Sequence, residues 1–254
     1  MSRRFAAPLA LRPEIAITVP TTAMVLAAGL GKRMRPLTTT RPKPLIEVAG
    51  RTLLDRALDH LRVAGVSRAV VNAHYFADQI VSHLAGQPAG LDIQLSDERG
   101  LLLETGGGVT KALPLIDSDP FYVVNSDNLW IDGSVDTLRL LAQRWDASEM
   151  DVLLLLVPLA RATGYDGRGD FHMDPAGLVR KRGEHRVAPY VFSGVQLLSK
   201  HLFEGEPVEP FTMWRVWDRA LAAGRVYGIV HQGLWFHVGT RQAVTETEAL
   251  LADS

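Results

Sequence analysis

The sequence predicts an α/β protein with a Rossmann-like, doubly wound sheet that is mostly parallel and has helices on both faces. Short apolar runs alternate along the chain with segments whose apolar residues recur at helical spacing. The first apolar run ends in a glycine-containing polar loop, as expected where a buried parallel strand reaches the edge of its sheet. After Pro158 the pattern changes to short segments separated by glycines, which predicts a small mixed α+β lobe.

The first half supplies the alternating elements in order. Apolar runs predict buried strands at 22–28, 68–72, 91–96, 121–124 and 151–157. Helical spacing predicts helices between them at 53–64, 76–84, 107–113 and 135–145. The first helix is expected to end at Gly65 and the third at Pro114, because glycine favours helix ends and proline cannot continue a helix.

The second half contains fewer helices. Strands are expected at 190–197, 226–231 and 234–238, with a helix at 212–223 between the first two. Thr240 can cap a closing helix that runs through Leu251. We expect residues 22–254 to form a single domain with halves at 22–158 and 159–254. Residues 1–21 have apolar stretches broken by Pro8 and Pro13, so they are expected to form a poorly ordered arm and not a signal peptide.

Composition excludes several classes of protein. The 254 residues include 27 Lys+Arg and 28 Asp+Glu, so the net charge of −1 argues against a nucleic-acid or membrane partner. The absence of cysteine excludes disulfides, thiolate metal sites and cysteine nucleophiles. No apolar run approaches the roughly 18 residues that span a bilayer. We therefore expect a cytoplasmic protein that is a monomer or a small homo-oligomer.

A basic loop follows the first predicted strand. Gly29 and Gly31 allow backbone N–H groups to turn toward an anion. Five cations and no acidic residue follow: Lys32, Arg33, Arg35, Arg41 and Lys43. Because open α/β sheets bind ligands at the carboxyl ends of their strands, the loop indicates a polyphosphate site, and the alternative is a solvated basic loop. Met34 stands where a dinucleotide fingerprint, G-x-G-x-x-G, has its third glycine, which excludes that motif. Arg33 follows Lys32 where a P-loop has Ser or Thr, which excludes a P-loop.

Residues 26–44 resemble the signature loop of the sugar-1-phosphate nucleotidyltransferases, L-A-A-G-x-G-x-R-x-x-P-L-T followed by P-K-P, and V-A-G-x-x-L continues it at 48–53. Within this family the chain is most similar to N-acetylmuramate-1-phosphate uridylyltransferases of cell-wall recycling, and then to mannose-1-phosphate guanylyltransferases. The resemblance implies a nucleotidyltransferase fold whose first half binds the nucleotide and whose second half binds the sugar. It implies that the phosphates are held by Ala28, Gly29, Gly31, Lys32 and Arg33, and that Lys43 contacts a reacting phosphate.

Two further segments fit that resemblance on the nucleotide side. Residues 104–108 (ETGGG) lie between a predicted strand and a helix, where three glycines permit close approach to a flat ligand. The resemblance implies that this segment borders the base and the sugar, with Glu104 and Gly107 among the nucleotide contacts. Asp127 follows a buried strand, at the end where a carboxylate can hold Mg²⁺ against phosphate oxygens. The alternative for such an aspartate is a helix cap or a turn.

The sugar side is less specific. Asn125, Gly169, Asp170, Ser193 and Gly194 lie in segments that resemble those shaping the sugar pocket of the uridylyltransferases. Trp214 and Trp217, at i and i+3, are expected to face the core. His237 stands where the family commonly has an aspartate that supplies the second metal carboxylate, so its metal contact is an open question.

The expected reaction joins an NTP and a sugar 1-phosphate to give an NDP-sugar and pyrophosphate. UTP and N-acetylmuramate 1-phosphate are the expected substrates, and Arg33, Lys43 and Asp127 the catalytic residues. The expected cofactor is Mg²⁺, with Mn²⁺ or another divalent ion as the alternative, held by Asp127 and His237. The competing hypotheses are a mannose-1-phosphate guanylyltransferase and a non-catalytic sensor of nucleotide sugars.

Overall fold

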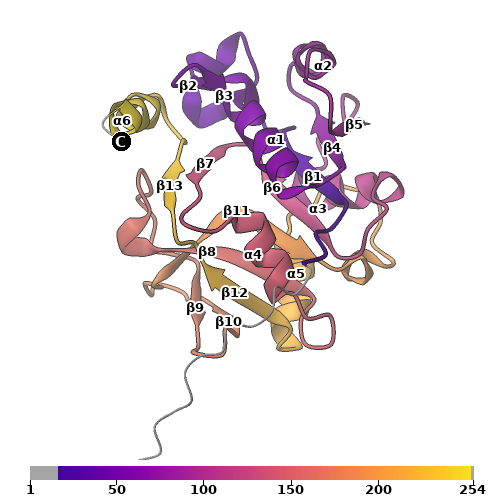
Figure 1. Cartoon of the computed structure of the whole chain (residues 1–254), viewed down its shortest axis with the longest axis vertical. Helices are drawn as coiled ribbons and strands as arrows, with labels where there is room; N and C mark the ends of the chain where they lie inside the picture. Colours follow the sequence, from indigo (N-terminus) through magenta and orange to yellow (C-terminus); the bar gives the residue numbers. More distant parts are fainter. Residues whose placement is uncertain (1–16, 253–254) are drawn as a thin grey trace, which may run out of the picture.

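The computed structural model of the chain describes residues 17–252 (Figure 1). Most of the expected N-terminal arm, residues 1–16, lies outside the described residues. Strand β1 begins at Thr22, where that arm was expected to end. Within residues 17–252, no helix has the length and apolarity needed to cross a membrane.

The main sheet has nine strands in the part of the chain that the structure describes, and one side of it is parallel. Strand β1 is flanked on both sides by parallel strands, and a fourth parallel strand forms the edge. These strands are β1 (Thr22–Leu26), β4 (Arg68–Ala73), β5 (Asp92–Asp97) and β6 (Phe121–Asn125). Strand β1 is shorter than expected, since the Ala27 N–H leaves the sheet and donates to Asn72 Oδ1 at 2.7 Å.

A strand from late in the chain lies in the middle of the sheet. Strand β11 (Tyr190–Leu198) runs antiparallel between β6 and β8 (Val152–Pro158), and β12 (Val226–Val230) adds parallel to β8. The hairpin of β9 (Phe171–Met173) and β10 (Val179–Lys181) joins β11 at Tyr190. Residues before and after position 158 therefore share one sheet.

Helices cover both faces of this sheet, which confirms the doubly wound α/β fold. The helices α1 (Leu53–Ala64), α2 (Ala77–Ala85) and α4 (Thr137–Arg144) pack on one face. The helices α3 (Glu104–Ala112) and α5 (Trp214–Ala222) pack on the other. The side chains of β1 alternate between these two cores, as period-2 geometry requires: Ala23 and Val25 face the first, and Met24 the second.

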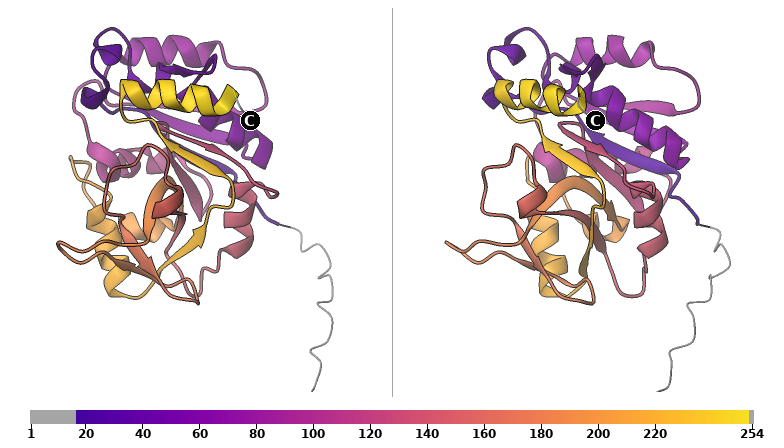
Figure 2. Two further views of the ribbon diagram at one scale, coloured as in Figure 1. Left: turned by 90° about the vertical axis from the view of Figure 1, so that its left-hand side faces the viewer. Right: turned by 60° about the vertical axis from the view of Figure 1, so that its left-hand side comes forward.

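A small second sheet was not predicted. Strand β7 (Asn128–Ile131) pairs antiparallel with β13 (Leu234–His237), in a register that sets His237 opposite Asn128. Met34, Leu129 and Phe236 form a third core with the C-terminal helix α6 (Arg241–Ala252). Figure 2 shows this helix beside the loop that follows β1 and the short strands β2 (Glu47–Val48) and β3 (Arg51–Thr52). The end of the chain therefore packs against the predicted phosphate loop.

Candidate active site

Three cavities meet at the carboxyl ends of β1 and β6. Their volumes are about 390, 210 and 390 Å³, and Leu26 and Asp127 line all three. The first extends toward β11 and α5, the second lies over the loop after β1, and the third lies between that loop and the start of α3. Asp127 therefore stands at the junction of three spaces, each large enough for part of a ligand.

The loop after β1 is folded into three 3₁₀ turns, at Lys32–Met34, Leu37–Thr39 and Lys43–Leu45. Gly31 has φ +58°, and an added Cβ there would lie 2.9 Å from Thr38 Cγ2 and 3.1 Å from Lys43 Cβ. Only glycine meets both requirements without strain. Thr38 Oγ1 also donates to the Gly31 carbonyl at 2.9 Å, so contacts within the loop fix its shape.

Lys43 and Asp127 form the central ion pair of the site, with Nζ 2.9 Å from Oδ2. The Lys43 side chain is 9% exposed and that of Asp127 is 36% exposed. Burial opposes ionisation of Asp127, but the Lys43 cation outweighs it, and the pKa of Asp127 lies below its usual value. The site therefore holds an ionised carboxylate beside a lysine at neutral pH.

Most of the predicted phosphate-binding residues surround these cavities. Lys32 and Arg33 are exposed at their rims, and the backbone of residues 28–31 lines their walls. Arg35 and Arg41 are also exposed, but neither lines one of the three cavities. The structure thus divides the five loop cations: Lys32, Arg33 and Lys43 face the cavities, and the other two do not.

The ETGGG segment is not the loop that the sequence predicted; it forms the first turns of α3, which begins at Glu104. Glu104 is exposed and lines two of the cavities. The glycines serve packing instead. The N–H groups of Gly106 and Gly107 donate to the Phe211 carbonyl, and a Cβ at Gly107 would collide with the Glu209 carbonyl. Gly107 is therefore buried against the segment before α5 and lines none of the three cavities, and its contact with the nucleotide stays a prediction.

Only some of the predicted sugar-side residues line a cavity. Asn125 and Asp170 line the first cavity, although Asp170 Oδ2 already accepts the Phe192 N–H at 2.9 Å. Ser193 is fully buried, and its hydroxyl accepts the Val195 N–H. Gly194, at φ +93°, lies against Asn125, while a Cβ at Gly169 would collide with the carbonyl of Ala188. Gly169, Ser193 and Gly194 thus shape the backbone and do not themselves line the cavity.

The first cavity has an aromatic wall that the sequence analysis did not foresee. Trp217 is a buried core residue and Trp214 packs against that core, as expected, but both also line this cavity. A buried polar residue of β11 lines it as well. The aromatic wall consists of Phe171, Phe192, Trp214 and Trp217, and the polar residue is Gln196. The polar residue at position 196, between Val195 and Leu197, was the available signal in the sequence.

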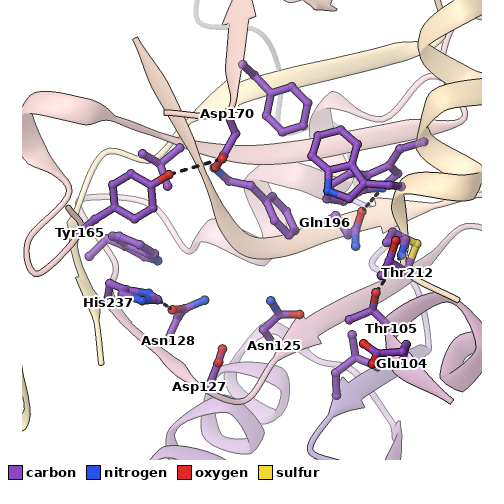
Figure 3. A pocket seen from close by; sticks show the side chains of 18 of the residues that line it. Glu104, Thr105, Asn125, Asp127, Asn128, Tyr165, Asp170, Gln196, Thr212 and His237 are labelled. Atoms are coloured by element: carbon purple, nitrogen blue, oxygen red, sulfur yellow. Dashed lines mark hydrogen bonds between the residues drawn. The ribbon is translucent and has the colours of Figure 1, made fainter. Parts of the chain in front are cut away.

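His237 lines the first cavity and is held by Asn128. Asn128 Nδ2 donates to the Ser193 carbonyl at 3.0 Å, which leaves Oδ1 to face His237 Nδ1 at 3.3 Å (Figure 3). Because that oxygen only accepts, Nδ1 carries the proton and the lone pair lies on Nε2. Burial, and then the Lys43 cation, lower the pKa of His237, so the ring is neutral at neutral pH.

The donor set at this junction fits a divalent ion that is shared with a substrate. Asp127 Oδ1 has no hydrogen-bond partner among residues 17–252, so this oxygen is free to act as a ligand. Mg²⁺ commonly takes one or two protein carboxylates, with substrate oxygens and water completing its shell. No cluster of three or more His, Asp or Glu ligands occurs in the described part of the chain.

Comparison with known proteins shows the family of the chain. Residues 23–226 match the MobA-like NTP transferase domain family. The chain is 45% identical over 238 residues to the N-acetylmuramate α-1-phosphate uridylyltransferase of Caulobacter vibrioides, covering 92% of this chain and 98% of that protein. It is 36% identical over 232 residues to the enzyme of the same name from Neisseria meningitidis, covering 90% and 97%.

Solved structures agree on the fold. HddC from Yersinia pseudotuberculosis, complexed with GMP-PN, superposes with a TM-score of 0.72 at 22% sequence identity. The superposition covers 91% of this chain and 99% of HddC. The fold predicted from the order of strands and helices is therefore shared with this solved structure.

Proposed function

The chain belongs to the MobA-like NTP transferase family, within its sugar-1-phosphate nucleotidyltransferases, and from this premise we propose that it transfers a uridylyl group from UTP to N-acetylmuramate 1-phosphate. The products are a UDP-linked sugar and pyrophosphate. The single observation that carries the proposal is the Lys43–Asp127 pair at the junction of three cavities, beside a preformed glycine loop. The choice of base and sugar is supported by similarity to the two uridylyltransferases.

The reaction needs charge neutralisation more than a protein nucleophile. A phosphate monoester has a second pKa of about 6, so the sugar phosphate is largely a dianion at neutral pH and can attack the α-phosphorus itself. The obstacle is that two polyanions must approach in line. Arg33 and Lys43, with the N–H groups of the loop after β1, are placed to neutralise the phosphates and to orient them.

Asp127 has two roles in this proposal. In the free protein it holds Lys43 in place through the 2.9 Å ion pair. Asp127 would also hold Mg²⁺, or Mn²⁺ as the alternative, through its free oxygen, and such an ion would supply further neutralisation of the phosphate oxygens. His237 faces the same cavity and is the proposed second contact. Its neutral imidazole adds no charge to a site that must receive two anions.

The biological setting follows from the proposed product. We place the enzyme in the cytoplasm, where it would return N-acetylmuramate recovered from the cell wall to a nucleotide-linked form. Ala28, Gly29, Gly31, Lys32 and Glu104 are the proposed nucleotide contacts. Asn125, Asp170 and Gly194 are the proposed sugar-side residues. We expect the enzyme to be a monomer or a small homo-oligomer. The proposed reaction needs neither a nucleic acid nor a membrane.

The test is a matrix of the four common NTPs against sugar 1-phosphates, with release of pyrophosphate as the readout. UTP with N-acetylmuramate 1-phosphate should give the highest kcat/KM. A preference for GTP with mannose 1-phosphate would replace the substrates and keep the reaction. Binding of a nucleotide sugar without pyrophosphate release from any pair would instead identify a sensor.

A further inference from the structure

Gln196 places an unused hydrogen-bond donor in the first cavity. It lies near the carboxyl end of β11 and is only 2% exposed. Its Oε1 accepts the indole N–H of Trp217 at 2.9 Å. An indole nitrogen can only donate, so this contact fixes which end of the amide is oxygen. Nε2 must then point the other way, and Figure 3 shows it directed into the cavity, on the side of Asn125.

The donor is rigidly held. The ring of Trp217 packs edge-on against Phe192 at 5.0 Å and against Trp214 at 5.1 Å between centroids, and it meets Phe171 at 5.9 Å. Neither the indole nor the amide bound to it can turn without disrupting this packing. The only side-chain hydrogen bond of Gln196 within residues 17–252 is the one through Oε1, so Nε2 is unpaired there. Since an unpaired amide in an apolar setting is costly, the cavity favours a ligand with an acceptor at this point.

The surroundings decide which acceptor fits. The wall beside Gln196 is aromatic, and among the described residues the only cation that lines the first cavity is Arg33, which belongs to the loop after β1. Lys181 lies over the Trp214 ring and pairs with the exposed Asp218. A carboxylate would be poorly neutralised by one amide in such a wall. A carbonyl with a methyl group matches it better, because the oxygen accepts from Nε2 while the methyl group contacts the rings.

We propose that Gln196, oriented by Trp217, is the specificity residue that recognises the acetamido carbonyl of the sugar 1-phosphate. The inference rests on the proposed function, since it assumes that the first cavity holds the sugar. It assigns the acyl subsite to the aromatic end of that cavity, away from the Lys43–Asp127 pair. Sugars that lack the acyl group leave Nε2 unpaired and lose this contact.

Two variants distinguish the effect of the Gln196 hydrogen-bond donor from that of the Trp217 ring that orients it. Gln196→Glu keeps an oxygen for the Trp217 N–H but replaces the donor with a second acceptor. Trp217→Phe keeps an aromatic ring but frees the amide to rotate. The matched control is Gln232→Glu, which makes the same change at an exposed position between β12 and β13. Thermal unfolding of each variant checks that the fold is retained.

The measurement is the ratio of kcat/KM for N-acetylglucosamine 1-phosphate to that for glucose 1-phosphate, two sugars that differ at the acetamido group. The wild-type protein should prefer the acetylated sugar by about 10- to 100-fold. Gln196→Glu should bring the ratio close to one without changing the KM for UTP, Trp217→Phe should give an intermediate ratio, and Gln232→Glu should match the wild type. An unchanged ratio in Gln196→Glu would overturn the inference while leaving the proposed reaction intact.

Direct binding covers the case in which no pair of substrates reacts. Failure of the wild-type protein to release pyrophosphate would remove the proposed function. Calorimetry with N-acetylglucosamine 1-phosphate would then test whether Gln196 contributes to binding of the acetylated sugar. Binding by the wild type that is weakened about 10-fold or more in Gln196→Glu would support the acyl subsite, and equal binding, or none, would reject it.

Discussion

The Nζ atom of Lys43 lies 2.9 Å from the Oδ2 atom of Asp127, which joins the last cation of the loop after β1 to the carboxylate that follows β6. The two residues are 84 positions apart in the chain, and parallel pairing of β1 with β6 brings them together. The pair orients the lysine toward the cavities while leaving one carboxylate oxygen free. It is the point at which phosphate binding and metal binding meet in the proposed reaction.

Lys43→Ala and Arg33→Ala should each lower kcat by about 10²-fold or more, because each removes a charge that acts on the transition-state phosphate. The matched control is Arg41→Ala, which removes an exposed cation of the same loop that lines none of the three cavities. Steady-state release of pyrophosphate measures kcat for all three variants. Equal losses in all three variants, or near wild-type rates in Lys43→Ala, would mean that the loop contributes only general positive charge.

His237→Asp should shift the metal preference toward Mg²⁺, because a carboxylate suits this hard ion better than an imidazole does. The wild type should show a relative gain with Mn²⁺ or Co²⁺. Activity with the three ions, compared in the wild type, His237→Asp and the exposed control His185→Asp, gives the answer. If the wild type shows no gain with the softer ions and the variant shows no shift, His237 does not contact the metal.

Asn72→Ala should lower the free energy of unfolding by about 2 kcal/mol and raise the KM for the nucleotide. Asn72 accepts the Ala27 N–H and donates to Glu98 Oε1, both at 2.7 Å, and Glu98 Oε2 accepts the Leu103 N–H. This buried chain ties the start of the phosphate loop to the start of α3. Urea unfolding and NTP titration measure the two effects.

Ser96→Ala is the matched control for that variant. Ser96 is buried opposite Asn72 on β5, and its hydroxyl has no hydrogen-bond partner within the described residues. Its removal should leave both stability and nucleotide KM close to the wild-type values. Equal destabilisation by Asn72→Ala and Ser96→Ala would show that the side-chain bonds of Asn72 add nothing beyond burial.

Acidification should destabilise the protein through His231. Burial lowers the pKa of this residue, which lies between Thr137 Oγ1 and the Leu234 carbonyl. The unfolded chain therefore binds a proton near pH 6.5 that the folded chain resists, so stability present above this pH is lost as the pH falls. His231→Gln should show a shallower fall in unfolding free energy between about pH 6.5 and pH 5. Parallel curves for the two proteins would contradict this assignment.

The sequence was a sufficient guide where local pattern decides structure. Apolar runs identified the strands around β1, and the glycines and prolines of residues 29–44 identified a shaped loop. It was insufficient where distant segments pair. The pairing of β7 with β13 joins residues about a hundred positions apart, and the antiparallel entry of β11 into the sheet has no local signal.

The candidate site shows the same division. Lys43 and Asp127 carry chemistry that their positions at strand ends predict. The packing role of the glycines at 106–108 could not be predicted, because a glycine needed for close packing and one needed for ligand approach look alike in sequence. Their partner, the Phe211 carbonyl, lies about a hundred residues further along the chain. Trp217 and Gln196 share this problem, since only the fold shows that both face a cavity.

Transfer of the uridylyl group is tested most directly by following labelled phosphorus in UTP. With N-acetylmuramate 1-phosphate present, the α-phosphorus should appear in the sugar nucleotide, and the β- and γ-phosphorus together in pyrophosphate. Asp127→Asn should slow both appearances equally, and neither should occur without the sugar phosphate. Release of the γ-phosphorus alone, or sugar-independent loss of label from UTP, would contradict nucleotidyl transfer at this site.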